Sequence, residues 1–390
     1  MVKFNKKKLT VFVIVMMLLS SALTFTGIHL YMSLTDKAVV SKEQYKTEHE
    51  IASKYAKLYV LQQKINKDFI WDTDENAQME NLYKSLVSSL GDEYSTYMTK
   101  EEFEKWAQYV TGTYEGIGVT FTVNDKNEIE IIDVNEKSPA KSAGLKEGDI
   151  LLSVDGKTYT NLDSVREAIR GKEGTTLKIK YRRDNKEAEA EIVRGVIEER
   201  SVFSGEQDGK GYIRISKFEK ETALQFKTEM SELENKGINS VVIDLRNNPG
   251  GIMESAIEIA DYLLPECNII YTKDKNNKKE YYNSDEKATK MNYVILVNED
   301  TASAAEILTV AVKENGGGKV VGTTTFGKGI VQFTEMLNDG SALKLTTREY
   351  FSPKNNKIHK TGVTPDVEVK LPEGAKMDTQ LLKAMEVLDK

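Results

Sequence analysis

Residues 241–251 have the sequence VVIDLRNNPGG, in which an apolar run leads into a turn with two glycines. The run Val241–Leu245 is rich in β-branched residues, which favour a buried strand. Gly250 and Gly251 permit backbone conformations that side chains resist, so a tight turn is predicted after that strand. Similar apolar runs alternate with helical patterns from residue 211 to residue 370, and this alternation predicts a mixed α/β layer.

The neighbouring segments extend this pattern in both directions. Strands are predicted at 211–215 and 293–297, and helices at 224–233, at 252–264 and from about 304 to 312, the last one ended by Gly316–Gly318. Ser303 is therefore expected where a strand passes into a helix.

The place of Ser303 has a chemical meaning. A helix amino terminus presents unpaired backbone N–H groups and the positive end of the helix dipole, which stabilise the oxyanion formed when a nearby nucleophile attacks a carbonyl. Position alone nevertheless favours a capping role, because serine is a preferred helix cap and Thr301 is a similar candidate.

A lysine between two glycines changes this balance. Lys328 lies in TTTFGKGIVQ, residues 323–332, where Phe326 and Ile330 indicate partial burial. Burial disfavours the ammonium form, so a neutral Lys328 would accept the Ser303 proton. Gln332 would hydrogen-bond the lysine nitrogen and orient it. Taken alone, Lys328 would be predicted as a solvated lysine and Gln332 as an exposed strand residue.

A separate β-rich domain is predicted at 112–200, with strands near 129–132 and 177–181 and a helix near 162–170. Its stretch SPAKSAGLKEGDIL (138–151) followed by Val154-Asp155-Gly156 resembles the PDZ signature. PDZ domains take a peptide as an added strand and bind its carboxylate in a glycine loop. The resemblance places this peptide-binding loop at Gly116, Ile117, Gly118 and Val119. Val165 is either a wall of the groove or a residue of the domain core.

The stretch Asp300–Ile307, with Phe326–Gly329 and Gln332, resembles the carboxyl-terminal processing peptidases, the tail-specific protease family. Both intervals, from Ser303 to Lys328 and from Lys328 to Gln332, match the family. The resemblance implies a catalytic triad of Ser303 as nucleophile, Lys328 as general base and Gln332. It further implies an oxyanion hole formed by the Ala304 N–H and the Gly250 N–H, with Gly251 as an alternative to Gly250. Ala305 and Asp300 depart from the serine and glycine common in the family motif.

The resemblance covers nearly everything after residue 40. Further matches lie at Leu90–Met98, Asp244–Gly251, Tyr350–Pro353 and Gly362–Asp366. It implies an α/β and α+β multidomain chain in which a PDZ domain joins a crotonase/Clp-like α/β peptidase core. It also implies that the partners are protein or peptide substrates with accessible C-terminal segments, and that the PDZ domain gates the peptidase site.

The amino terminus predicts a membrane segment. Lys3, Lys6, Lys7 and Lys8 precede an apolar run, Leu9–Met32, that exceeds the roughly 20 residues needed to span a bilayer. The positive flank predicts a cytoplasmic amino terminus and an extracytoplasmic catalytic part. A signal peptide is the alternative, but the run continues past the best cleavage site at Ser20–Ala22, so we favour a single-pass, uncleaved anchor in the cell membrane over a secreted form.

Four regions are thus expected: a basic flank and signal anchor (1–33), a helical arm (34–111), the PDZ domain (112–200) and the peptidase core with its C-terminal segment (201–390). Helical spacing of apolar residues through 42–108 predicts the arm. An arm of this kind packs on its own domain or forms a homodimer interface, and the sequence leaves both open.

Composition excludes several classes of function. The net charge of −7 is spread over mixed-sign segments, which argues against a nucleic-acid surface. No Cys or His cluster has metal-ligand spacing, so neither a metal nor a cofactor is expected. The single Cys267 is predicted to be a buried structural thiol. Two rivals remain: a Ser-His-Asp hydrolase with His359 as base, and a catalytically inactive, membrane-anchored PDZ adaptor that binds peptides.

Overall fold

The structure is a computed structural model that describes residues 6–35, 40–372, 374–375 and 377–389. The chain divides into two compact units, Met1–Gln78 and Met79–Lys390.

The first unit consists of helices. Helix α1 (Lys6–Thr35) is long and apolar enough to cross a membrane, although a signal sequence would have the same properties. Helix α2 (Lys42–Asp68) begins at Ser41, whose side chain accepts a hydrogen bond from the Gln44 N–H. A third helix, α3 (Glu75–Ser88), starts in this unit and continues into the second.

Within the second unit, one core belongs to an antiparallel sheet in the order β3-β4-β5-β6-β7. Ile117, Ile131 and Ile179 are fully buried in this core. Two short strands pair beside it, β2 (Thr113–Gly116) and β8 (Gly195–Glu198). The remaining elements are β3 (Val119–Val123), β4 (Ile129–Val134), α5 (Pro139–Ser142), β5 (Ile150–Val154), α6 (Leu162–Ile169), β6 (Thr176–Arg183) and β7 (Lys186–Val193).

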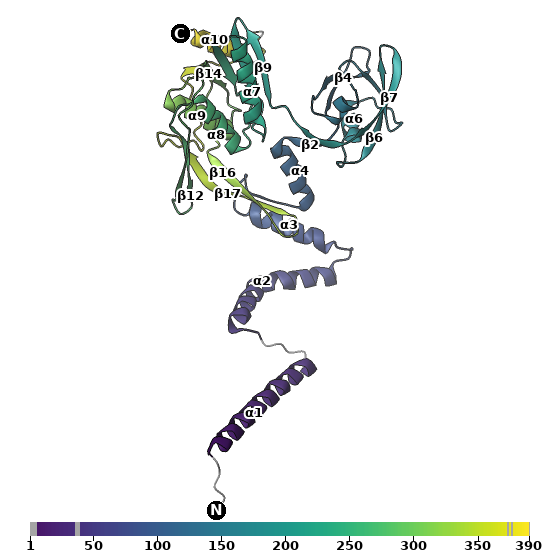
Figure 1. The fold of residues 1–390 in the computed structure, drawn as a ribbon, viewed down its shortest axis with the longest axis vertical. Coiled ribbons are helices and arrows are strands. Elements are labelled where there is room, and N and C mark those ends of the chain that lie inside the picture. The colour runs from purple at the N-terminus through teal and green to yellow at the C-terminus, as the bar shows by residue number, and fades with distance from the viewer. Residues whose placement is uncertain (1–5, 36–39, 373, 376, 390) are drawn as a thin grey trace, which may run out of the picture. The chain divides into compact units, whose positions relative to one another are not determined.

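The larger core surrounds a six-stranded sheet in the order β18-β15-β14-β11-β10-β9. Strands β9 and β14 of this sheet are labelled in Figure 1, together with helices α7, α8 and α9. Its five strands other than β9 run parallel, with registers such as Ile243↔Ile295, and β9 pairs antiparallel to β10. The strands are β9 (Val202–Gln207), β10 (Lys210–Ile215), β11 (Ser240–Asp244), β14 (Asn292–Val297), β15 (Lys319–Gly322) and β18 (Val367–Glu368).

Helices cover both faces of this sheet, which explains why its strands are continuous apolar runs. Val241 and Ile243 face a core shared with α7 (Thr222–Asn235), α8 (Met253–Leu263) and α9 (Ala304–Asn315). Val242 points to the opposite face, where it packs with α10 (Thr379–Leu388).

A second sheet of the core is built around the long strand β17 (Ala342–Phe351). One edge of β17 pairs with β16 (Ile330–Met336), and its other edge pairs with β1 and then with β12. These outer strands are β1 (Thr96–Met98), β12 (Asn268–Asp274) and β13 (Lys279–Asn283).

The strands and helices predicted between 129 and 315 are confirmed, but the prediction of one helical segment through 42–108 is wrong in part. Strand β1 interrupts it, and α4 (Lys100–Thr111) is a separate helix with a capping box of Thr99 and Glu102. Pairing of Tyr97 with Leu343, which is remote in sequence, overrides the local helical pattern. Gly112 ends α4 in the left-handed conformation.

Candidate active site

The predicted catalytic residues line one cleft of about 450 Å³ in the second unit. Three segments form its walls: the turn and helix start at 249–254, strand β16 at 330–334, and helix α4 through Trp106, Tyr109 and Val110. Ser303, Lys328 and Gln332 all contribute to the lining, together with Gly250, Lys217, Ile307, Lys344 and Tyr350.

Ser303 is the N-cap residue of α9 and has a strained backbone. Its φ of 55° lies in the left-handed region, which non-glycine residues rarely adopt. Such a conformation costs about 1–3 kcal/mol and is frequent at functional sites. The next residue, Ala304, begins α9, and its N–H has no acceptor among the described residues. A free N–H and the positive end of the helix therefore meet beside Ser303.

The glycine turn at Gly250 and Gly251 lies directly against the loop that carries Ser303. Gly250 has a φ of 94°, and a Cβ added to it would lie 2.7 Å from Ser303 Cβ and 2.8 Å from the Ala304 nitrogen. The Gly250 N–H donates to Asn248 Oδ1 (2.8 Å), so it is occupied in this structure. The Gly251 N–H has no acceptor in the described part of the chain. Of the two glycines predicted for the oxyanion hole, Gly251 thus offers the unoccupied donor.

Phe218 fixes the glycine turn from the opposite side. Its N–H donates to the Gly250 carbonyl (2.9 Å), and its carbonyl accepts the Ile252 N–H (2.7 Å). A Cβ on Gly251 would lie 2.0 Å from the Phe218 carbonyl oxygen, so this close approach requires glycine.

A buried carboxylate connects the loop that carries Ser303 to the loop that carries Lys328. Glu306 is fully buried. Its Oε2 accepts the backbone N–H groups of Ser303 (2.9 Å) and Lys328 (2.8 Å). Its Oε1 accepts the Gly327 N–H (2.7 Å) and the Thr325 hydroxyl (2.6 Å). Four donors satisfy this carboxylate, which holds both loops in one arrangement.

Lys328 is partly buried, as predicted, and its two flanking glycines explain how. A Cβ on Gly329 would lie 2.2 Å from the His359 nitrogen, and one on Gly327 would lie 2.9 Å from the Gly362 nitrogen. The segment 358–362 therefore packs directly against the loop that carries Lys328. The charged groups near Lys328 include a second lysine, Lys344.

The groups around Lys328 shift its pKa in opposite directions. Burial lowers the pKa of Lys328, and the positive charge of Lys344 lowers it further. The carboxylates of Asp92, Glu93 and Glu306 oppose this shift. In addition, the Lys328 Nζ lies 4.5 Å from the centroid of the Tyr94 ring, an attraction that favours the charged form.

The three predicted triad side chains share the cleft without direct hydrogen bonds to one another among the described residues. Gln332 Nε2 donates to Thr346 Oγ1 (3.2 Å). Sequence reasoning missed Tyr94, Thr346 and the role of Glu306. A signal for Tyr94 was present, since it belongs to the Leu90–Met98 motif, but nothing in its sequence position indicated contact with Lys328.

The predicted peptide-binding loop lies at the start of the small antiparallel sheet. Gly118 has a φ of 78°, and a Cβ there would lie 2.4 Å from Ser138 Cβ. Val119 begins β3, whose only strand partner among the described residues is β4, so one edge of β3 is open. Val165 is fully buried in the same core as Ile117, and its side chain presents no surface to a peptide.

The remaining candidates lie outside the cleft. His359 packs behind Gly329 and is not among the residues that line the cleft, so no Ser-His pair is formed there in the described structure. Cys267 is only partly buried, against the core, with its Sγ 3.2 Å from Ser284 Oγ. No group of three His, Cys, Asp or Glu side chains in the described residues is placed to hold a metal ion.

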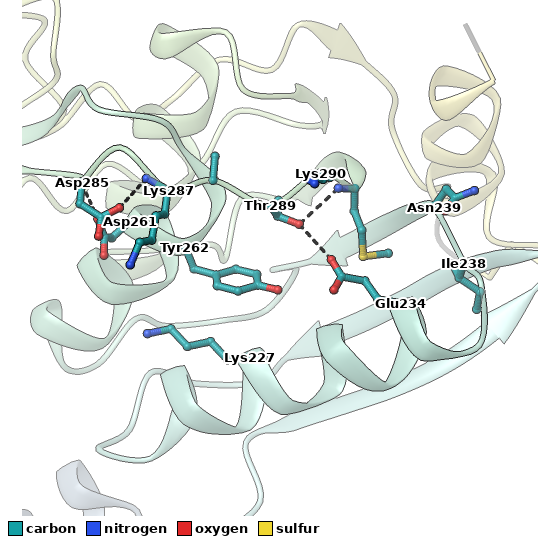
Figure 2. A pocket seen from close by; sticks show the side chains of 12 residues that line it. Lys227, Glu234, Ile238, Asn239, Asp261, Tyr262, Asp285, Lys287, Thr289 and Lys290 are labelled. Atoms are coloured by element: carbon teal, nitrogen blue, oxygen red, sulfur yellow. Dashed lines mark hydrogen bonds between the residues drawn. The ribbon is translucent and has the colours of Figure 1, made fainter.

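Two larger pockets in the peptidase core differ from the cleft in their lining residues. One, of about 700 Å³, lies by α7 and has a charged lining in which the Thr289 hydroxyl donates to Glu234 (Figure 2). The other, of about 790 Å³, contains Arg246, whose guanidinium is paired with Asp244 and Asp378. Neither contains a serine or cysteine nucleophile, so size alone does not identify the catalytic site.

Fold and cleft together define a class: a serine-type peptidase core joined to a PDZ domain. Residues 209–369 match the model of peptidase family S41, and residues 116–193 match that of the PDZ domain. The carboxy-terminal processing protease CtpA of Bacillus subtilis (strain 168) is 36% identical over 333 residues, which cover 83% of this chain and 71% of that protein. The chain therefore belongs to peptidase family S41 and, within it, to the carboxy-terminal processing proteases.

Two further similarities were found, one in sequence and one in fold alone. A probable CtpA-like serine protease of Staphylococcus haemolyticus (strain JCSC1435) is 36% identical over 315 residues, covering 79% of this chain and 63% of that relative, which is less than two thirds of its length. The photosystem II D1 C-terminal processing protease has a similar fold, with a TM-score of 0.50 and 23% identity, over 85% of this chain and 91% of that one.

Proposed function

We propose that this chain is a membrane-anchored endopeptidase that cleaves exported or membrane-associated proteins, with Ser303 as nucleophile and Lys328 as general base. One observation carries the proposal: Ser303 and Lys328 line the same cleft while Glu306 binds the backbone N–H groups of both. The free Ala304 N–H at the start of α9 supports an oxyanion hole beside the nucleophile.

The reaction follows from these positions. Neutral Lys328 takes the Ser303 proton as the hydroxyl oxygen attacks the scissile carbonyl. The Ala304 N–H and a glycine N–H stabilise the tetrahedral oxyanion, with Gly251 as donor, or Gly250 once its bond to Asn248 is released. The protonated lysine then gives its proton to the leaving amine. Water, activated by the same lysine, hydrolyses the acyl-enzyme.

This reaction requires two side chains to move. Lys328 Nζ must turn from the Tyr94 ring towards Ser303 Oγ, and Gln332 must exchange its bond with Thr346 for one with the lysine nitrogen. The arrangement with Lys328 over Tyr94 would then be a resting state. Apo sites commonly have looser catalytic contacts than their substrate complexes.

The PDZ domain would select the substrate. A C-terminal segment would add to the open edge of β3, with its carboxylate in the Gly116–Val119 loop. Binding there would gate access to the cleft. Helix α1 would hold the chain in the membrane, with everything after residue 33 on the extracytoplasmic side.

Cleavage of casein and of a peptide with a free C-terminal tail tests the catalytic assignment. The Ser303→Ala and Lys328→Ala variants are expected to lose turnover while keeping their circular dichroism spectrum and their affinity for the tail peptide. Wild-type turnover by either variant would refute its role. If wild type binds the peptide tightly but cleaves nothing, the chain acts as a PDZ adaptor.

A further inference from the structure

A second lysine in the candidate cleft takes no part in the proton transfers of the proposed reaction. Lys344 lies on β17 opposite Thr334 of β16 and lines the same cleft as Ser303 and Lys328. Its Nζ lies 5.9 Å from the ring centroid of Trp106, which comes from the other wall of the cleft. The side chain is partly buried.

This cation has no ion-pair partner within the described part of the chain, unlike Lys217 in the same cleft, which pairs with Glu219 at 3.4 Å. Asp92, ahead of β1, acts on both Lys344 and Lys328, whereas Glu93 and Glu306 act on Lys328. None of these carboxylates lies within ion-pair distance of either ammonium group. A partly buried ammonium without a counter-ion is unfavourable, and a ligand carboxylate would relieve this cost.

The strand register places Lys344 along the path of a bound peptide. Strand β16 leaves Lys328 at Ile330 and reaches Thr334, opposite Lys344, four residues later. Four strand residues span about 13 Å, so an extended peptide lying along β16 reaches Lys344 about four residues from the scissile bond. Strand β16 has β17 as its only strand partner among the described residues, which leaves its other edge open.

We propose that Lys344, with Trp106, forms an anion subsite of the catalytic cleft that binds a substrate carboxylate about four residues from the scissile bond. The inference rests on the proposed function, because it assumes that peptides occupy this cleft. The carboxylate belongs either to the C-terminus of the substrate or to an Asp or Glu side chain. Both sources have the same chemistry, and Trp106 limits the space on the other side of the ammonium.

Matched fluorogenic peptides test the subsite. One set differs in the C-terminus, free acid against amide, at increasing distance from the scissile bond. The other set is amidated and carries Glu or Gln at each of these positions. The enzymes are wild type, Lys344→Met, Lys344→Arg and a charge-matched control, Lys290→Met, which alters the separate pocket of Figure 2.

With wild type we expect KM for one carboxylate peptide to be at least about 10-fold lower than for its neutral partner, since charge-assisted hydrogen bonds are the strong ones. Measured on the high-pH plateau, where Lys328 is neutral with or without the Lys344 charge, Lys344→Met should remove this difference through KM. Lys344→Arg should retain it, and Lys290→Met should behave as wild type. The set that shows the difference identifies the source of the carboxylate.

Two results would overturn the subsite: no preference for any carboxylate peptide in wild type, or equal changes of KM for acid and neutral peptides in Lys344→Met. Equal changes of KM together with a displaced pH profile would mean that Lys344 acts through Lys328 alone. If no peptide is cleaved, the subsite is tested by binding instead. Fluorescence anisotropy then compares the peptide affinities of Ser303→Ala and Ser303→Ala/Lys344→Met. A carboxylate-dependent difference in affinity between these two supports the subsite even where the proposed catalysis fails, and equal affinities refute it.

Discussion

The charge on Lys328 is set by neighbours that were not visible in its own sequence context. Burial and Lys344 favour the neutral amine, whereas Tyr94 and three carboxylates favour the ammonium. The proposed reaction needs the neutral amine of Lys328, so small changes around this nitrogen should change the rate.

The pH dependence of cleavage tests this balance. A base whose pKa is lowered becomes neutral at lower pH, so kcat/KM should rise with pH through the pKa of Lys328, below the ordinary range for lysine. Initial rates with a neutral peptide across the stable pH range measure this limb. A profile that falls over the same range would contradict the assignment of Lys328 as base.

Removal of the Tyr94 ring should make Lys328 easier to deprotonate. A cation–π contact is worth about 0.5–2 kcal/mol and one pKa unit about 1.4 kcal/mol, so Tyr94→Leu should displace the rising limb by about half a unit or more towards lower pH. Tyr94→Phe keeps a ring and should keep the wild-type profile. An identical profile for Tyr94→Leu would mean that the ring contact has no energetic effect.

Glu306 should affect both catalysis and stability. In Glu306→Gln an NH2 group replaces one carboxylate oxygen and cannot accept hydrogen bonds from the backbone N–H donors. The free energy of unfolding should therefore fall by about 1–3 kcal/mol. We expect kcat to fall at least about 100-fold, because the loops of Ser303 and Lys328 lose their common partner. Urea unfolding and single-turnover rates measure the two effects.

The matched control is Glu299→Gln, which makes the same change at a carboxylate bonded to Thr323 in the neighbouring loop. It should leave kcat unchanged. Full activity of Glu306→Gln would show that the four hydrogen bonds do not position the catalytic loops.

At the scale of elements, the segment Leu90–Met98 belongs to the peptidase core although it precedes the PDZ domain in sequence. It supplies strand β1 and places Tyr94 against Lys328. The Ser95 hydroxyl accepts the Thr346 N–H (3.0 Å), and Thr346 in turn contacts Gln332. This segment therefore supports β17, the strand whose Thr346 contacts the third predicted triad residue.

The glycine turn offers a second test at this scale. Gly250→Ala would strain the backbone at φ 94° and bring a methyl within 2.8 Å of the Ala304 nitrogen, so activity should be lost and stability lowered by at least about 1 kcal/mol. Gly209→Ala has a similar positive φ of 73° but open space around it, so it should be destabilised yet fully active. Equal activity of the two variants would remove the turn from the site.

Local patterns predicted the elements better than their contacts. The apolar runs at Val241–Leu245 and 293–297 are buried on both faces of a parallel sheet, so their sequence alone indicates a strand. Strand β1 has three residues and depends on Leu343, so no local periodicity reveals it. The positions of Ser303 and Lys328 in one cleft agree with the family spacing, but their interactions with Glu306 and Tyr94 arise only when distant loops fold together.

At the scale of the whole molecule, the chain is divided between an amino-terminal helical unit with the apolar helix α1 and a larger unit that begins at Met79. The three hydrophobic core clusters and every residue of the candidate cleft lie in the larger unit. The apolar helix and the candidate catalytic residues thus lie in different parts of the chain.

Deletion of residues 1–39 tests this separation. The truncated chain should be recovered in the soluble fraction and should cleave the neutral peptide with wild-type kcat/KM, because it loses the exposed apolar helix and no buried core. Centrifugal fractionation and peptide assays measure both properties. A truncated chain that is soluble and folded but inactive would show that the first residues contribute to catalysis.

The shared carboxylate also has a consequence for protein engineering. Since Glu306 fastens both loops, the number of residues between Ser303 and Lys328 is not what sets their separation. The covalent connection between them runs through helix α9 and the bend at Gly316–Gly318, whereas the Glu306 hydrogen bonds join the two loops directly. This catalytic pair is therefore better transplanted to a new scaffold as three residues and their bonds than as a stretch of fixed length.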